Sequence, residues 1–274
     1  MTDFLVAAEA AVKADDPKLA LSALTSAVKA SPASSKLRIF MAQLLCVLGQ
    51  WERAHTQLNV VADMDASTSP MREMVGHALR CELLRAAVFE GKRSPMVFGQ
   101  PDEWLALLIE SLLQSGQGAH EMSAQLATRA FEAAPATRGR INGEPFEWIA
   151  DADSRLGPVL EAMVNGKYYW IPFSRLSTIL IEAPTDLRDR VWLPANISFS
   201  NGGEAIAMIP TRYPGSQASD DGQILMARKT VWRDLGSDRW AGLGQRLLVT
   251  DLGEHDMLNV RQIELESGAS AAES

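Results

Sequence analysis

Four carboxylates lie close together near the middle of the chain, and their types and spacing make them the first candidates for chemistry. They are Glu144, Glu147, Asp151 and Asp153. Asp151 and Asp153, two positions apart, could present two carboxylates to a hard divalent cation. A calcium loop starting there would also need a glycine at the sixth position and a glutamate at the twelfth, and both are missing. We therefore predict a structural role, in which one aspartate caps a turn or pairs with Arg155, and no metal or other cofactor.

The remaining reactive side chains do not form a catalytic arrangement. No histidine lies at a zinc-binding spacing from a cysteine or from another histidine. Ser216 lacks the flanking glycines of a nucleophile elbow, and the sequence has no glycine-rich phosphate loop. The sequence therefore predicts no catalytic residues. A hydrolase or metal-dependent enzyme centred on Glu144–Arg155 remains the alternative, and alanine at both aspartates would separate the two: an enzyme loses turnover, whereas a structural cap loses thermal stability.

Aromatic residues flank the acidic segment. Trp148, Tyr168, Tyr169 and Trp170 are expected in the core of a sheet, with a peptide-binding patch as the alternative. The set with a structural role or a possible site therefore consists of Glu147, Trp148, Asp151, Asp153 and Arg155.

The secondary-structure elements that position these residues include a sequence repeat in the first half of the chain. At an offset of about 34 residues, Ala20 aligns with Ala54 and Leu24 with Leu58, and paired helices with this period are typical of tetratricopeptide repeats. A long helix is predicted over 70–90, and further helices over 102–114 and 119–134. The apolar, proline-bracketed loop 94–101 is expected to pack against another part of the protein. Stacked helix pairs leave a groove for a partner's helix or extended segment, so we predict partner binding.

The second half has the pattern of strands. Asn165-Gly166 and Asn201-Gly202 each separate two β-prone runs, which is a strong hairpin signal. Further strands are predicted near 178–182, 223–227, 230–235, 246–250 and 257–260. The predicted class is α+β: a tetratricopeptide-like α-α superhelix over 1–137, a compact antiparallel β-rich, barrel-like domain over 138–264, and a disordered tail over 265–274.

The bulk composition limits the partners. The net charge of −8, without clustered basic residues, disfavours a broad nucleic-acid surface and attraction to anionic lipid. Cys46 and Cys81 lie in apolar helical sequence, where free buried thiols are expected. No leader pattern begins the chain, and no apolar run approaches the roughly 20 residues that span a bilayer. We expect a cytoplasmic protein without membrane insertion.

Several stretches together carry a resemblance: Leu44–Ala54, Val97–Leu105, Gly143–Pro158, Tyr168–Phe173 and Thr211–Ser216. The chain resembles the ImpE/SciE family, also called TagJ, from about residue 5 to 262. The resemblance implies an accessory component of bacterial type VI secretion that is not an enzyme. Its implied partners are the small subunit of the contractile sheath and, as a further possibility, the N-terminal domain of the ClpV ATPase that recycles the sheath. A generic tetratricopeptide adaptor unrelated to secretion is the other alternative.

The resemblance also suggests that the amphipathic first helix docks the ATPase. The alternative is a helix that only packs on the first repeat. The residues expected to contact partners are Phe4, Leu5, Ala8, Val12, Trp51, Phe98 and Trp104.

Overall fold

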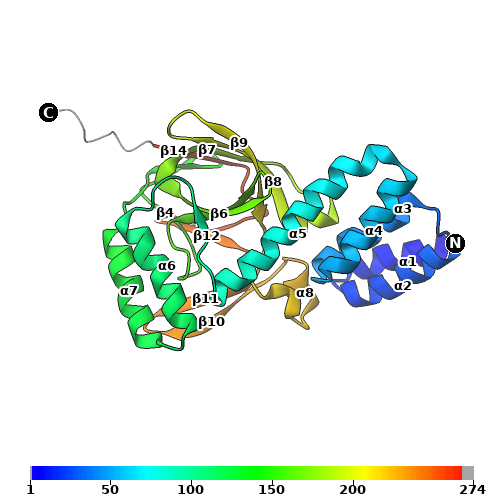
Figure 1. The fold of residues 1–274 in the computed structure, drawn as a ribbon, viewed down its shortest axis with the longest axis horizontal. Coiled ribbons are helices and arrows are strands. Elements are labelled where there is room, and N and C mark those ends of the chain that lie inside the picture. The colour runs from blue at the N-terminus through cyan, green and yellow to red at the C-terminus, as the bar shows by residue number, and fades with distance from the viewer. Residues whose placement is uncertain (1, 267–274) are drawn as a thin grey trace.

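A computed structural model of the chain describes residues 2–266 and places a β-rich body between two groups of helices (Figure 1). The helices are α1 Thr2–Lys13, α2 Pro17–Ala30, α3 Ser35–Val47, α4 Trp51–Met64, α5 Ser69–Phe89, α6 Glu103–Gly116, α7 His120–Ala133 and α8 Gly222–Leu225. The strands are β1 Met96–Val97, β2 Gly139–Ile141, β3 Glu144–Phe146, β4 Ile149–Asp151, β5 Val159–Val164, β6 Lys167–Pro172, β7 Leu176–Ile181, β8 Trp192–Phe199, β9 Glu204–Pro210, β10 Thr230–Gly236, β11 Arg239–Gly244, β12 Leu247–Thr250, β13 Gly253–Asp256 and β14 Gln262–Leu265.

The predicted repeat is present in α1 to α4. Pro17 occupies the first turn of α2, where its missing N–H is not needed, and the Asp16 side chain accepts a hydrogen bond from the Leu19 N–H at 2.8 Å. α4 begins at Trp51, the position equivalent to Pro17 at the predicted offset. Both aligned alanines are fully buried, because a side chain of that size lets the paired helices approach closely.

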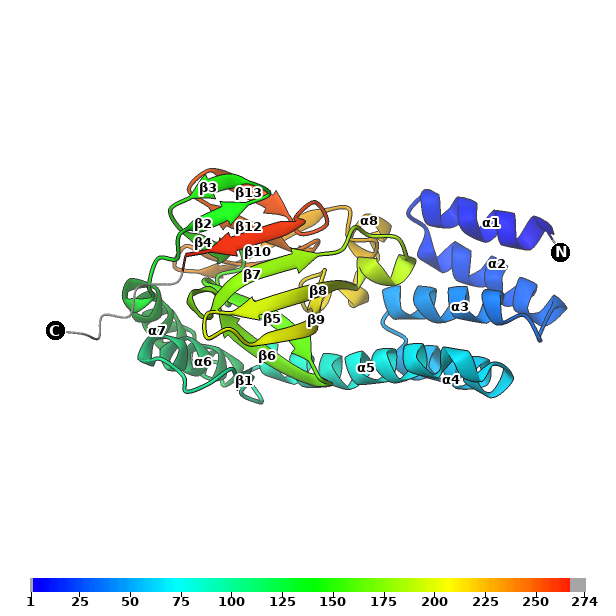
Figure 2. The same ribbon diagram turned by 90° about the horizontal axis from the view of Figure 1, so that it is seen from above.

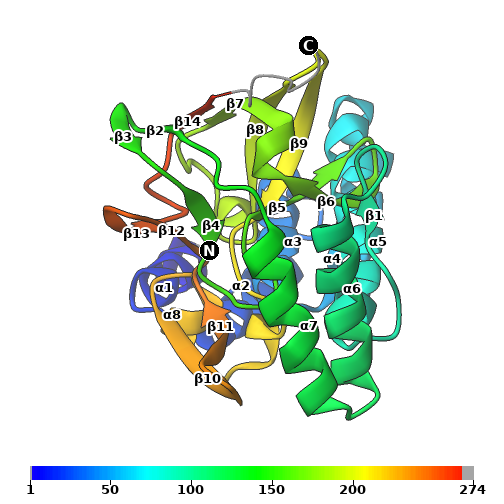
Figure 3. The ribbon, with the colours of Figure 1, turned by 90° about the vertical axis from the view of Figure 1, so that its left-hand side faces the viewer.

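The helices before residue 137 do not form one continuous stack, contrary to the expectation of a single helical domain over that range. α5 runs from the repeats along the body, and α6 and α7 form a separate hairpin at the opposite end (Figure 2). Seen from that end, α6 and α7 lie in front of the sheet (Figure 3). The break falls in the predicted apolar loop, where β1 pairs with β6 and Phe98 stacks on Phe199 with ring centroids 4.4 Å apart.

The main sheet has the order β1-β6-β5-β9-β8-β7-β14-β2-β3. Both predicted hairpins are confirmed: β5 turns into β6 through Asn165 and Gly166, which both have positive φ, and β8 pairs with β9. Smaller sheets are formed by β10-β11 and by β13-β12-β4. The α+β class is confirmed, but the sheet is not a closed barrel, since β1 and β3 stand at its two ends, and β1 is parallel to β6.

Three predictions for local structure were wrong. Residues 223–227 fall in α8 and the turn after it, because Asp221 caps that helix by accepting the Gln223 N–H at 2.9 Å. Residues 257–260 form a buried turn between β13 and β14, whose apolar side chains pack inward without a strand. Leu265, assigned to the tail, ends β14 and pairs with Gly139. Glu266, also assigned to the tail, donates its N–H to the Arg138 carbonyl at 2.9 Å, and the remaining residues of the predicted tail, 267–274, lie outside the described residues.

Two apolar clusters form the core. The first joins the helices to one face of the sheet and includes Tyr168, Trp170 and Trp192, and the second fills the other face. Trp51 of α4 packs against Trp192 with the ring centroids 5.8 Å apart and the rings tilted by 31°, so the repeats and the sheet share one interior. No helix within residues 2–266 combines the length and apolar character needed to cross a membrane.

Both cysteines are free and buried, as predicted. Burial raises the pKa of the Cys46 thiol to about 12 and that of Cys81 to about 11, so both thiols stay protonated and unreactive.

Gly91 follows the C-terminal end of α5, has a φ of +68° and lies where α5 and α6 approach each other closely. Substitution of this glycine tests how much space the close approach leaves. A Cβ at this position would lie 2.5 Å from the Leu112 carbonyl oxygen and 2.6 Å from the Gly116 Cα. Gly118 is a matched control, because its φ of +81° is similar but a Cβ there would have nothing within 4 Å. We expect Gly118→Ala to lose about 1 kcal/mol of unfolding free energy from backbone strain, and Gly91→Ala to lose about 1–3 kcal/mol more from overpacking. Equal losses in urea titrations would show that the two helices do not meet here.

Candidate functional site

Eight charged side chains meet between α5 and the β-rich body, and we call them the buried charge network. Four are carboxylates and four are guanidinium groups, so their formal charges balance. They are Glu82, Arg85, Asp151, Asp153, Arg155, Glu161, Arg212 and Arg246. All are buried except Arg155, whose side chain is 13% exposed. Buried charges need ion-pair or hydrogen-bond partners to be stable. Seven of the eight form ion pairs with one another, and Arg212 donates to backbone carbonyls.

Glu161 is the centre of the network. Side chains alternate along β5, so Val159, Glu161 and Met163 face the helices while their neighbours face the other cluster. The Glu161 carboxylate accepts two hydrogen bonds from the Arg85 guanidinium, at 2.8 and 3.0 Å, and forms an ion pair with Arg246 at 3.0 Å. The Tyr168 hydroxyl also donates to it. This fully buried carboxylate therefore joins α5 to two parts of the β-rich body.

α5 contributes two charges one helical turn apart. Arg85 also donates to the Arg212 carbonyl at 2.8 Å, and Glu82 accepts a hydrogen bond from the Trp192 indole N–H at 2.9 Å. Glu82 and Arg85 lie within 3.5 Å of each other. The helix is thereby fixed to β5, to β8 and to the segment after β9.

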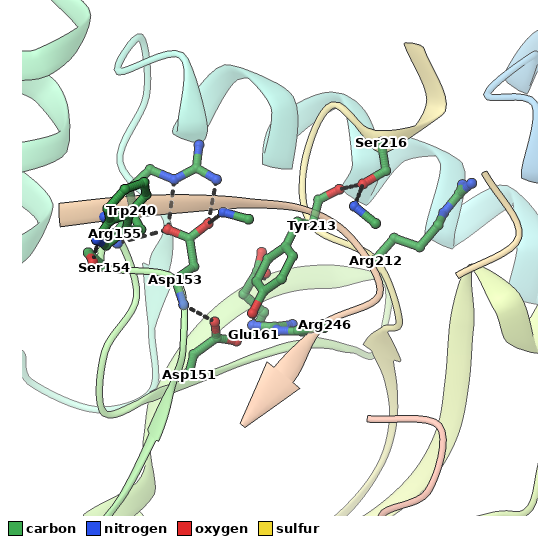
Figure 4. A network of polar contacts seen from close by, with 12 residues as sticks. Asp151, Asp153, Ser154, Arg155, Glu161, Arg212, Tyr213, Ser216, Trp240 and Arg246 are labelled. Carbon is green, nitrogen blue, oxygen red and sulfur yellow. Dashed lines mark hydrogen bonds and ion pairs between the residues drawn. The ribbon is translucent and has the colours of Figure 1, made fainter. Parts of the chain in front are cut away.

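Asp151 and Asp153, the two aspartates singled out in the sequence, form ion pairs with different arginines (Figure 4). Asp151 pairs with Arg246 at 2.5 Å. Asp153 shows the expected pairing with Arg155, at 2.6 and 2.9 Å, and also accepts the Gly242 N–H of β11 at 2.9 Å. Their carboxylates therefore secure β4, β11 and the start of β12.

Arg212 links the network to the repeats. It donates to the Val47 carbonyl at the end of α3 and to the Leu225 carbonyl at the end of α8, at 2.8 and 2.6 Å. The carbonyl ends of helices carry partial negative charge that suits a cation. Burial lowers the pKa of Arg212 to about 10, against the raising effect of Glu82, so the group is charged at neutral pH.

Ser216 has a structural part in the same region (Figure 4). It is fully buried, donates to the Tyr213 carbonyl at 2.6 Å and accepts the Gly244 N–H at 2.8 Å. The Tyr213 hydroxyl in turn bonds the backbone of Leu247. The segment 211–216 thus ties β11 and β12 together.

The network shifts two carboxyl pKa values in opposite directions. Burial raises the pKa of Glu161, but Arg85 and Arg246 outweigh it and bring the value to about 2. At Asp151 burial dominates over the attraction of Arg246, and the pKa rises to about 6. Each of the four carboxylates in the network is already engaged by a guanidinium group. Within residues 2–266, no three His, Cys, Asp or Glu side chains are grouped to hold a metal ion.

The other predicted site residues do not join the network. Glu147 is exposed and pairs with Arg138 at 2.8 Å, and Glu144 is exposed in β3. Trp148 is 38% exposed, so its expected place in the core was wrong. Tyr168 and Trp170 are in the core as predicted, and Tyr169 packs on Phe98.

Most residues expected to contact partners are engaged within the protein. Ala8 and Trp104 are buried, so they offer no surface to a partner and that assignment was wrong. Trp51 and Phe98 are half-buried against Trp192 and Phe199, and Leu5 and Val12 are half-buried in the core of the repeats. Phe4 differs, with 46% exposure on α1.

Sequence reasoning missed Glu161, Arg85, Arg212 and Arg246. The signal at Glu161 was a single acidic residue inside the apolar run 159–164. A charge in the middle of a buried strand requires a buried counter-charge, and that requirement was available from the sequence.

Glu161→Gln tests the centre of the network and its dependence on pH. The amide keeps the shape but leaves two buried arginines without their counter-charge, so we expect a loss of about 3–5 kcal/mol in unfolding free energy at pH 7. The pKa of Glu161 is depressed by folding, so its stabilisation is present above its ordinary pKa of 4.5 and is lost as pH falls towards 2.

The stability difference between wild type and Glu161→Gln should therefore shrink as pH falls from 4.5 to 2 in urea titrations. Glu132→Gln, at an exposed position of α7, is the control with the same chemical change. A difference that stays constant over this range would contradict the depressed pKa.

Comparison with known proteins agrees with both halves of the structure. The ImpE protein family model matches residues 143–264, and a tetratricopeptide repeat model matches residues 11–76. The chain is 47% identical over 247 residues to a Pseudomonas aeruginosa protein named type VI secretion system accessory component TagJ. That match covers 90% of this chain and 86% of the relative.

A crystal structure of VPA1032 from Vibrio parahaemolyticus has the same fold, with a TM-score of 0.86 at 23% identity. It covers 96% of this chain and 98% of its own. The extent of the match to the Pseudomonas relative shows that the chain belongs to the ImpE/TagJ family.

Proposed function

We propose that this protein is a non-catalytic accessory component of a type VI secretion system, which holds the small sheath subunit and the N-terminal domain of the ClpV ATPase. The observation that carries the proposal is the 47% identity, over 90% of the chain, to a relative named as such a component. The proposal implies a cytoplasmic location.

The architecture supports a holding role. The repeats α1 to α4 extend from the β-rich body (Figure 1), and stacked helix pairs of this kind present surfaces for partner segments. The buried charge network fixes their position through Arg85 and Arg212. A rigid platform loses little conformational freedom when it binds, which favours affinity.

α1 offers an accessible apolar surface for the ATPase domain. Phe4 and Val6 are 46% and 56% exposed, whereas Ala8 and Ala11 of the same helix are buried against the repeat. Deleting the helix would expose that interior, so substitutions at the surface are the cleaner test. They leave the packing of α1 on α2 unchanged.

The test measures retention of the purified small sheath subunit and of the purified ATPase N-domain on the immobilised full chain. We expect wild type to retain both, and the double variant Phe4→Ser/Val6→Ser to lose most of the ATPase domain because its apolar contact is removed. The control is Leu83→Ser/Met122→Ser, which changes two exposed apolar residues on α5 and α7. Retention of neither partner by wild type would refute the proposal. Equal loss in both double variants would refute the role of α1.

A further inference from the structure

A polar pocket of about 390 Å³ lies between the α6–α7 hairpin and the β10–β11 hairpin. These elements lie beside one another in Figures 1 and 3, and Arg239 of β11 donates to the Ser123 hydroxyl of α7 at 3.2 Å. Arg155 lines it from the network side, and Arg233 lines it from β10.

The pocket gathers positive charge in a chain whose net charge is −8. Its lining contains three arginines and a single carboxylate, Asp234, which already accepts the Gly236 N–H of the hairpin turn at 2.7 Å. The charge of Arg155 is matched by Asp153. Arg239 and Arg233 have no carboxylate within ion-pair distance among the described residues.

Arg239 has an incomplete set of partners. Its Nε is buried from solvent and has no hydrogen-bond partner within the described part of the chain. Burial without a nearby carboxylate also lowers its pKa. A buried donor on an unmatched cation is stabilised by an incoming oxyanion, and the planar guanidinium suits a carboxylate or phosphate.

The rest of the lining selects between ligand classes. Ser111, Ser115 and Ser123 supply hydroxyl groups, and Leu108, Leu112 and Leu235 supply aliphatic surface. The described residues that line the pocket include no Phe, Tyr or Trp on which a nucleotide base would stack. Cationic, hydroxylic and aliphatic groups together fit an acidic side chain with an aliphatic neighbour.

We propose that this pocket binds an acidic peptide segment of a protein partner, whose carboxylate is held by Arg233 and Arg239 while an adjacent aliphatic side chain contacts the leucines of α6. The inference rests on the proposed function, because a peptide ligand presupposes a protein partner. The inference adds a binding site for acidic peptide segments at the end of the molecule opposite the repeats.

The probe is a fluorescein-labelled hexapeptide of alternating glutamate and leucine, and binding is measured by fluorescence anisotropy. We expect Arg233→Gln/Arg239→Gln to weaken binding by about tenfold or more, because charge-assisted hydrogen bonds to the carboxylate are lost. Arg93→Gln/Arg129→Gln removes the same charge from exposed positions outside the pocket and should leave the affinity unchanged. Ser115→Glu places a carboxylate at the pocket wall, where it would repel the acidic peptide, and should also weaken binding. Thermal unfolding of each variant verifies the fold.

Equal affinity of the pocket variant and wild type, or equal binding of a peptide with glutamine in place of glutamate, would overturn the inference. Binding of inorganic phosphate without binding of the acidic peptide would overturn the peptide class. Retention of the sheath subunit and ATPase domain is measured separately on wild type. If neither protein is retained while the peptide binds through the arginines, the proposed function fails and the pocket assignment stands. If both proteins are retained but the peptide does not bind through the arginines, only the pocket assignment fails.

Discussion

The carboxylate of Glu161 lies where α5 crosses the sheet, and it must stay charged in a site without solvent. Arg85 and Arg246 approach it from α5 and from the β11–β12 connection. Such a group is tolerable only when both arginines are in place, because an unpaired buried charge is strongly destabilising. This constraint makes the position of the long helix, and of the repeats that continue from it, depend on the sheet.

The consequence is a molecule whose two ends are held in a fixed relation. Arg212 extends the network to the ends of α3 and α8, and Trp51 packs against Trp192 where the repeats meet the sheet. At the other end, the Asp153–Arg155 pair sits beside the polar pocket under α6 and α7. The two proposed binding surfaces, on the repeats and at the pocket, therefore lie at opposite ends of one rigid body.

The sequence predicted the parts of the fold that depend on local periodicity and turn chemistry. The aligned alanines at 20 and 54 set the repeat, and Asn165-Gly166 set the first hairpin. Prediction from the sequence failed where contacts between distant residues determine the structure. The turn at 257–260 is apolar because it is buried, and its apolar residues were mistaken for a strand. α6 and α7 leave the helical stack because β1, just before them, joins the sheet. At the site, Asp153 with Arg155 was predictable from spacing, whereas Arg85 and Glu161 are brought together by the tertiary fold alone.

A double-mutant cycle between Arg85→Gln and Glu161→Gln, with unfolding free energies measured in urea at pH 7, measures how strongly the charge on α5 and the charge on β5 stabilise each other. We expect the double variant to be more stable than the sum of the single losses implies, with a coupling energy of about 2–3 kcal/mol. Additive losses would contradict this prediction, because they would mean that Arg85 and Glu161 do not stabilise each other.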